Sequence, residues 1–214
     1  MLSFKNNLLK KIIKLIKWLL ITLTISLVIL FFYTKRLWKD FITEKEIDEL
    51  VYEIKSSKEL PQKLYEIYEI EYPKSLTKDA NLLLLNSIIS NEVYHKNPSI
   101  QLIQISGLVW KKSLVTNNFY YKLIELSLTW KIEEKTTQKE CLNWVAEHYD
   151  FTNNIKNIQN ASIFYFNKNL ENLNESELIG LIVLMKNPRL YNPIRQKERY
   201  ETKVNQILMK LKKD

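Results

Sequence analysis

The sequence predicts an all-α protein in which one apolar helix near the N-terminus precedes a helical domain. Apolar side chains recur at helical spacing along most of the 214 residues. Two of the expected helix starts carry a capping-box pattern, in which Thr or Asn is followed three residues later by Glu. No segment shows the alternation of apolar and polar residues that marks a strand. The chain length suits one globular domain behind the apolar helix.

Residues 18–33 have the composition of a membrane anchor. This segment, WLLITLTISLVILFFY, contains no charged side chain. It is shorter than the roughly 20 residues that span a bilayer. Apolar residues within 12–16 extend it, because Lys14 and Lys17 can snorkel to the interface. No small-residue cleavage site follows Tyr33, which favours an uncleaved anchor over a signal peptide.

Basic residues flank this anchor and indicate its orientation. Residues 1–39 hold eight Lys or Arg and no Asp or Glu, so residues 40–214 hold the other 24 basic side chains and all 24 acidic ones. More basic residues precede the apolar run than follow it, which predicts a single-pass protein of the cytoplasmic membrane with its N-terminus in the cytoplasm and its domain outside. A nucleic-acid-binding domain would carry a basic surface on its folded part, so we expect no nucleic-acid partner.

Helical spacing and helix breakers predict the elements that follow the anchor. Residues 40–60 form a juxtamembrane helix that ends before Pro61, and residues 62–72 show a short, mixed pattern. The further helices are expected at 80–92, 99–110, 119–134, 137–149, 155–165, 174–186 and 195–212.

Two of these helices begin with a capping box: Thr137 precedes Glu140, and Asn174 precedes Glu177. The second of them is apolar and stops at the Pro-punctuated loop 187–193. We expect three regions: a cytoplasmic stub with the anchor, a juxtamembrane region, and a helical domain. Their ranges are 1–38, 39–76 and 77–214.

Cysteine and histidine provide no metal site in this sequence. Cys141 is the only cysteine, which excludes an intrachain disulfide and a cysteine-based metal cluster. His95 and His148 are isolated from other ligand-type residues. No metal-ligating residue is therefore assigned.

Short motifs occur in a fixed order along the second half of the chain. Lys122 and Glu125 are spaced as Lys-x-x-Glu on a predicted helix, and the loop 187–193 reads NPRLYNP. This order resembles the peptidoglycan glycosyltransferase domain (glycosyltransferase family 51) of monofunctional transglycosylases and class A penicillin-binding proteins. The family pattern runs without gaps from Lys122 to the end of that loop, and Lys203 stands where its last motif has Arg. Tyr121 replaces the Arg of the family's Arg-Lys-x-x-Glu motif.

Two motifs of this family are eroded here. The family's Gly-Gly-Ser-Thr-Ile-Thr-Gln-Gln segment corresponds to residues 97–104, NPSIQLIQ, in which Ser99 and Gln104 match. The first motif, Glu-Asp-x-x-Phe-x-x-His-x-Gly, is not recognisable, and spacing places its Glu near Glu69. The rival positions are Glu66 and Glu71.

The resemblance implies a lysozyme-like helical domain that polymerises lipid II into glycan strands at the membrane, with lipid II or the growing strand as its ligand. Such a reaction needs a carboxylate that takes the proton of the attacking hydroxyl. It also needs cations, or Mg²⁺ or another divalent metal as cofactor, to stabilise the departing pyrophosphate. The implied roles are Glu69 as base, Glu125 as the carboxylate that orients the pyrophosphate or its metal, Lys122 and Lys203 as phosphate clamps, and Ser99 and Gln104 as substrate-binding residues of the cleft.

The residues also leave a non-catalytic function open. Pro98 has no N–H donor, and the lost glycines no longer allow close approach of the backbone to a phosphate, so donor binding is weakened or altered. A catalytically inactive descendant would act as a scaffold or binding subunit with other cell-wall synthesis proteins, and an unrelated helical adaptor is a third alternative. The plain structural alternatives are solvated charges for Glu66, Glu69, Glu71 and Lys203, a surface pair for Lys122 with Glu125, and helix capping for Ser99 and Gln104.

Overall fold

The structure, a computed structural model, describes residues 2–81, 97–108 and 118–212. Every named element in these residues is a helix, and the β-type pairing among them is limited to one isolated bridge. The prediction of an all-α chain is therefore confirmed. The helix expected at 80–92 falls mostly outside the described residues.

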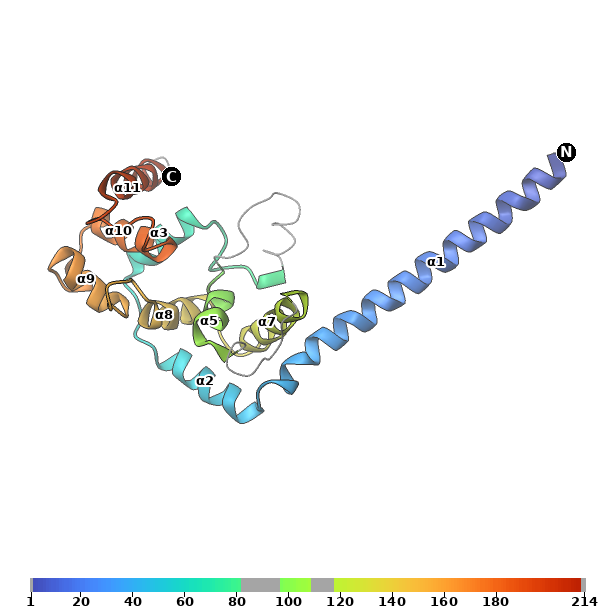
Figure 1. Cartoon of the computed structure of the whole chain (residues 1–214), viewed down its shortest axis with the longest axis horizontal. Helices are drawn as coiled ribbons and strands as arrows, with labels where there is room; N and C mark the ends of the chain where they lie inside the picture. The colour runs from blue at the N-terminus through green and yellow to red at the C-terminus, as the bar shows by residue number, and fades with distance from the viewer. Residues whose placement is uncertain (1, 82–96, 109–117, 213–214) are drawn as a thin grey trace.

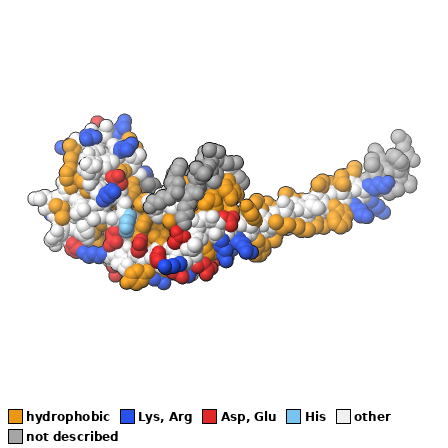
Figure 2. All heavy atoms as spheres, turned by 60° about the horizontal axis from the view of Figure 1, so that its bottom comes forward, with side chains coloured by type: hydrophobic (Ala, Val, Ile, Leu, Met, Phe, Trp, Pro, Cys, Tyr) orange, Lys and Arg blue, Asp and Glu red, His pale blue; other side chains and the backbone are white. Residues whose placement is uncertain are grey.

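Helix α1, Leu2–Arg36, extends away from the other helices (Figure 1). Its side chains from Lys10 to Tyr33 are exposed, and Figure 2 shows apolar atoms along it between basic groups near both ends. The segment Lys10–Asp40 has a mean hydropathy of 2.4 in its most apolar window and is long and apolar enough to cross a membrane. The expected N-terminal apolar helix is thus present, and no residue of its most apolar window is buried by the rest of the protein.

The C-terminal end of α1 is joined to the domain by buried contacts. A 3-10 helix, η1 (Leu37–Asp40), follows α1 and buries both Leu37 and Trp38. The backbone N–H of Trp38 donates to Ser127 Oγ at 2.9 Å on helix α7, Asn118–Glu133. Helix α1 therefore leads directly into the core of the domain.

Helices α2 and α3 cover the C-terminal half of the chain. Helix α2, Glu44–Ser56, begins with a third capping box, from Thr43 to Glu46, and packs against α8, Gln138–His148. Helix α3, Gln62–Glu71, packs against the last two helices of the chain.

Helix α3 is regular although the sequence pattern of this region is mixed. Tyr65 and Tyr68 explain the difference, because both are buried while each carries a hydroxyl. The Tyr65 hydroxyl donates to Asn143 Oδ1 at 2.6 Å, and the Tyr68 hydroxyl accepts from Gln101 Nε2 at 3.3 Å. These hydrogen bonds satisfy the two tyrosine hydroxyls inside the core. The tyrosine side chains can therefore lie on the buried face of α3.

Helix α5, Pro98–Ser106, lies against α7 and α8. Its N-cap is Asn97 and not Ser99, because Asn97 Oδ1 accepts the backbone N–H groups of Ser99 at 3.1 Å and Ile100 at 3.3 Å. Gly107 ends the helix with a φ of 67°, a left-handed conformation that glycine adopts without steric cost.

The C-terminal helices complete the core. Helix α9, Ile158–Phe166, begins later than the expected residue 155, because residues 152–154 and Asn157 turn the chain through positive φ. Helix α10, Glu175–Lys186, starts with the capping box predicted at Asn174, and all of its residues from Leu178 to Met185 are buried. Helix α11, Lys197–Leu211, packs on α10 and α3. The predicted capping box at Thr137 is also present, on α8.

Candidate functional site

Gln104 of α5 and Glu125 of α7 meet where these two helices pack together. The exposed side chain of Gln104 donates from Nε2 to Glu125 Oε1. Helix packing thus brings together two positions that belong to different predicted motifs. The second oxygen of Glu125 accepts no hydrogen bond from the described residues.

Lys122 lies one turn before Glu125 on α7 and has an exposed side chain. The two residues form no ion pair with each other in the structure as described. Burial raises the pKa of the adjacent Tyr121 phenol, and the charge of Glu125 raises it further. Tyr121 stands where the Arg-Lys-x-x-Glu motif has Arg. This region of α7 therefore has one positive charge fewer near Glu125 than the motif provides.

Ser99 lies in a buried polar network. Its hydroxyl donates to Glu133 Oε1 at 2.6 Å and also contacts Asn97 Oδ1. The same Glu133 oxygen accepts from Gln138 Nε2 at 2.6 Å and from the Ala80 N–H at 3.0 Å. Burial raises the pKa of Glu133 against the opposing effect of these hydrogen bonds. Ser99 therefore joins α5 to α7 and α8, and its side chain is not presented to solvent.

Glu69 closes the turn that follows α3. Its Oε2 accepts the Lys74 N–H at 3.0 Å, and its Oε1 accepts the Leu76 N–H at 2.7 Å. The rival Glu66 is exposed and pairs with Lys63 at 3.2 Å. No hydrogen bond or ion pair within the described ranges joins Glu69 to the other predicted site residues.

The second rival, Glu71, is held by three lysines. Its side chain is 3% exposed, and its Oε1 lies 2.7 Å from both Lys186 Nζ and Lys203 Nζ. Lys210 Nζ lies 3.6 Å from the other oxygen, Oε2. Burial favours a raised pKa, but the hydrogen bonds from Lys186 and Lys203 outweigh it and hold the pKa of Glu71 below its ordinary value. These four residues, which we call the Glu71 cluster, join the end of α3 to α10 and α11.

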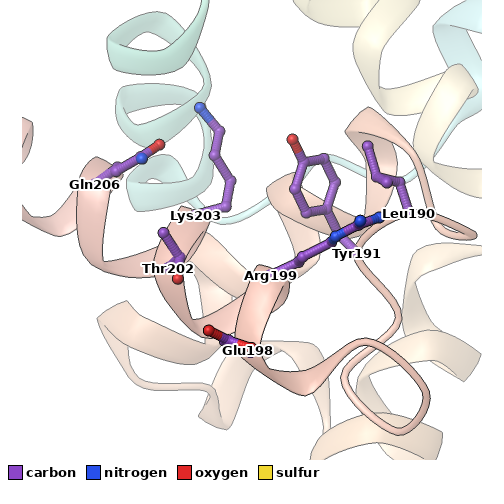
Figure 3. Close-up of a pocket in the computed structure, with 7 residues that line it drawn as sticks. All are labelled: Leu190, Tyr191, Glu198, Arg199, Thr202, Lys203 and Gln206. Carbon is purple, nitrogen blue, oxygen red and sulfur yellow. The ribbon is translucent and has the colours of Figure 1, made fainter.

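A pocket of about 500 Å³ opens beside the Glu71 cluster, between α11 and the loop 187–193 (Figure 3). Lys203 and the hydroxyl of Tyr191 point toward the same side of it, and Arg199 extends from α11 toward the loop. Of the predicted site residues, Lys203 lines this pocket. The lining residues are Leu190, Tyr191, Glu198, Arg199, Thr202, Lys203 and Gln206.

Residues that could bind a divalent metal are not clustered in the part of the chain that the structure describes. No three His, Cys, Asp or Glu side chains lie together there. Glu125 has an amide as its partner, and Glu71 has lysines. Because Mg²⁺ is commonly held by one or two carboxylates together with substrate phosphates, Glu125 would need phosphate oxygens to complete such a site.

Lys186 and Lys210 of the Glu71 cluster correspond to no motif position and escape sequence analysis. Lys203 and Lys210 lie two turns apart on α11, so helical periodicity alone places them on one face. Their shared partner, Glu71, lies more than a hundred residues earlier, and no local pattern connects it to them.

Comparison with known proteins gives two findings. Residues 100–212, more than half of the chain, match the family model described as Transglycosylase. The chain is also similar to penicillin-binding protein 4 of Bacillus subtilis (strain 168), with 30% identity over 95 residues. Those residues are 44% of this chain and 15% of that protein, so the chain spans a small part of the relative's length. The matched region contains Gln104, Glu125 and Lys203 but begins after Glu69 and Glu71.

Proposed function

The chain belongs to the transglycosylase family, and on that premise we propose that it is a membrane-anchored peptidoglycan glycosyltransferase that polymerises lipid II into glycan strands. The contact between Gln104 and Glu125 carries the proposal, because it joins two motif positions of the matched region into one exposed polar pair. The growing glycan strand and lipid II are the proposed ligands.

The position of α1 supports action at a membrane. Both proposed substrates are lipid-linked, so the domain has to work close to the bilayer surface. The exposed apolar helix α1 leads into the domain through the buried residues Leu37 and Trp38. The excess of Lys before the apolar run supports a single-pass arrangement in the cytoplasmic membrane, with the N-terminus in the cytoplasm and the domain outside.

The proposed chemistry divides between two carboxylates and two lysines. Glu69 would take the proton of the acceptor hydroxyl as that oxygen attacks the anomeric carbon. Each oxygen of Glu69 uses one lone pair on a backbone N–H and keeps another for a substrate proton. Glu125 would orient the pyrophosphate, with Lys122 and Lys203 stabilising its negative charge. The reaction class implies a divalent metal as cofactor.

The test is polymerisation of labelled lipid II by the purified full chain in detergent with Mg²⁺. We expect glycan chains from the wild type and a loss of about 10²–10⁴-fold in rate for Glu69→Gln, the size expected for a general base. Glu66→Gln is the matched control, because this exposed carboxylate lies one turn earlier on α3. No glycan chains from the wild type, while a working relative produces them, would contradict the proposal.

A second candidate function is a catalytically inactive scaffold for cell-wall synthesis proteins. Ser99 is buried in a structural network, and Tyr121 stands where the motif has Arg, which favours this reading. A scaffold would retain its cellular role after Glu69→Gln and Glu125→Gln, provided that both variants remain folded. Loss of a cell-wall phenotype in these variants would instead support catalysis.

A further inference from the structure

Another pocket lies where α1 joins the domain, away from the candidate functional site. It has a volume of about 470 Å³, and residues at the end of α1, in η1, at the start of α2 and at the end of α7 line it. Its lining side chains are four cations, two carboxylates and two aromatic rings. We call it the junction pocket. None of the residues assigned to the proposed reaction lines it.

The junction pocket carries more positive than negative charge. One carboxylate, Glu134, is shared by two lysines: its Oε1 lies 3.4 Å from Lys35 Nζ, and its Oε2 lies 3.1 Å from Lys131 Nζ. The other carboxylate, Glu44, lies 4.0 Å from Lys39 Nζ and has a side chain that is 71% exposed, so this pair contributes little. The pocket therefore has room for a further negative charge.

Arg36 is the fourth cation of the pocket. Its side chain is exposed and forms no ion pair or hydrogen bond with the described residues. A guanidinium group presents paired N–H donors whose spacing matches two oxygens of a phosphate group. Arg36 thus offers the pocket a set of phosphate-type donors that the described part of the domain does not use.

Trp38 holds two of the lysines beside the pocket without neutralising them. Its side chain is 5% exposed, and the ammonium groups of Lys39 and Lys131 lie 5.4 Å and 5.1 Å from the centre of its ring. An aromatic ring attracts a cation through its quadrupole and leaves the charge in place. These two charges are therefore positioned before any ligand binds.

The pocket adjoins the apolar surface that would lie in the bilayer. Side chains of α1 are exposed up to Tyr33, and Lys35 and Arg36 follow within about 5 Å along the helix axis. The polar layer on each side of the hydrocarbon core is about 5–8 Å thick, so these cations would lie among lipid headgroups. Phe32, which is 65% exposed, belongs to the apolar segment and also lines the pocket. Figure 2 shows basic side chains next to apolar ones where α1 meets the domain.

We propose that the junction pocket binds the phosphate group of an anionic phospholipid, such as phosphatidylglycerol, from the leaflet next to the domain. Arg36 and Lys39 hold the phosphate oxygens, and Phe32 contacts the acyl chains. A ligand with an anionic group joined to apolar chains matches the cations beside an apolar surface. A zwitterionic lipid brings its own ammonium group, which the excess of positive charge disfavours. The inference rests on the membrane anchoring in the proposed function but not on glycan synthesis.

The test is native mass spectrometry of the purified full chain, released from neutral detergent micelles that contain dioctanoyl phosphatidylglycerol or dioctanoyl phosphatidylcholine. We expect saturable binding of the anionic lipid and about tenfold weaker binding of the zwitterionic one. Arg36→Gln should weaken binding of phosphatidylglycerol about tenfold, because it removes the paired donors. Lys39→Gln is a second variant with an expected loss in the same direction. Equal affinities of the wild type for the two lipids would overturn the proposal.

Lys17→Gln is the matched control for charge. It removes one exposed cation from the other flank of the same apolar run, about 28 Å from Arg36 along the helix and beyond the Debye length of about 10 Å. We expect binding within about twofold of wild type. Losses as large as that of Arg36→Gln would overturn the proposal, because they would show that total juxtamembrane charge, and not the pocket, attracts the lipid.

Two further measurements separate this inference from its alternatives. Thermal unfolding of Arg36→Gln should match wild type within a few degrees, because the side chain has no described partner. Glycerol 1-phosphate should bind at least tenfold more weakly than the lipid, and equal affinity would overturn the assignment to a lipid. Lipid binding without glycan synthesis would uphold this inference while the proposed catalysis fails. Glycan synthesis by a chain that binds both lipids equally would do the reverse.

Discussion

Glu133 accepts several hydrogen bonds at the junction of α5, α7 and α8. Burial raises its pKa, and the bonds from Ser99, Ala80 and Gln138 offset this only in part. A carboxyl group with a raised folded pKa stabilises the fold fully below its ordinary pKa, and this stabilisation is lost as the pH rises through the folded pKa. The neighbouring Glu134 behaves in the opposite way, because Lys131 and Lys35 lower its pKa against the effect of burial.

We predict that Glu133→Gln and Glu134→Gln change the pH dependence of stability with opposite signs. Relative to wild type, Glu133→Gln should gain about 2 °C in melting temperature between pH 4 and pH 7, because the amide cannot ionise. Relative to wild type, Glu134→Gln should lose stability over the same interval, because the wild-type ion pairs of Glu134 contribute fully above the ordinary carboxyl pKa and are lost as the pH falls through the lowered pKa of the folded state. Circular dichroism melts at several pH values measure both. Parallel slopes for the two variants would show that burial does not dominate at Glu133.

Individual residues were predictable from sequence where a motif or a cap defines them. The capping boxes at Thr137 and Asn174 follow from local spacing, and both are present. The contact of Gln104 with Glu125 depends on how α5 packs on α7, which no local pattern specifies. The Glu71 cluster shows the same limit more strongly, because α3, α10 and α11 contribute to it from distant parts of the chain. The catalytic roles of Glu69 and Glu125 stay predictions.

At the level of elements, the crossing of α10 and α11 depends on Gly180. A Cβ atom built at this position would lie 2.0 Å from Tyr200 Oη and 2.9 Å from Phe166 Cζ. Alanine has the higher helix propensity by about 1 kcal/mol. Overpacking of a buried site costs about 1–3 kcal/mol, and the 2.0 Å contact places Gly180 in the upper part of this range, so the steric effect is the larger one.

We predict that Gly180→Ala lowers the free energy of unfolding by about 1–2 kcal/mol, the balance of these two effects. The double variant Gly180→Ala/Tyr200→Phe should recover part of the loss, because it removes the nearest clashing atom but leaves Phe166 in place. Thermal unfolding of the two variants and of Tyr200→Phe alone measures the coupling between the sites. A Gly180→Ala variant as stable as wild type would mean that α11 shifts freely on α10.

The boundaries of elements were predictable where breakers and caps mark them. The start of α10 after Asn174 is of this kind, whereas α5 ends at Ser106 before Gly107, earlier than the expected residue 110. Helix α3 was not predictable from its sequence pattern. Its tyrosines carry polar hydroxyls, and only tertiary hydrogen bonds to these hydroxyls allow the side chains to be buried. The late start of α9 has a local cause, the side chain of Asn157, which accepts the N–H of Asn160 and so caps the helix there.

At the scale of the whole molecule, helix α1 changes from exposed to buried where it joins the domain. The apolar surface of α1 is exposed up to Tyr33, whereas Thr34, Leu37 and Trp38 are buried. The Lys35 ammonium also lies 3.4 Å from Glu134 Oε1 beyond α7. Burial of α1 side chains therefore begins at Thr34, although Phe31 already contacts Trp130 of α7, with the ring centroids 5.5 Å apart.

We predict that deletion of residues 1–33 releases the chain from membranes but leaves the domain folded. The deleted side chains with described surroundings are exposed, so the melting temperature should change by no more than a few degrees. Deletion of residues 1–40 should behave differently, because it also removes Leu37 and Trp38 from the core, and burial of side chains of this size contributes about 2–5 kcal/mol each. Membrane sedimentation and thermal unfolding separate the two effects. If both deletions left the domain equally stable, η1 would be part of the anchor and not of the domain.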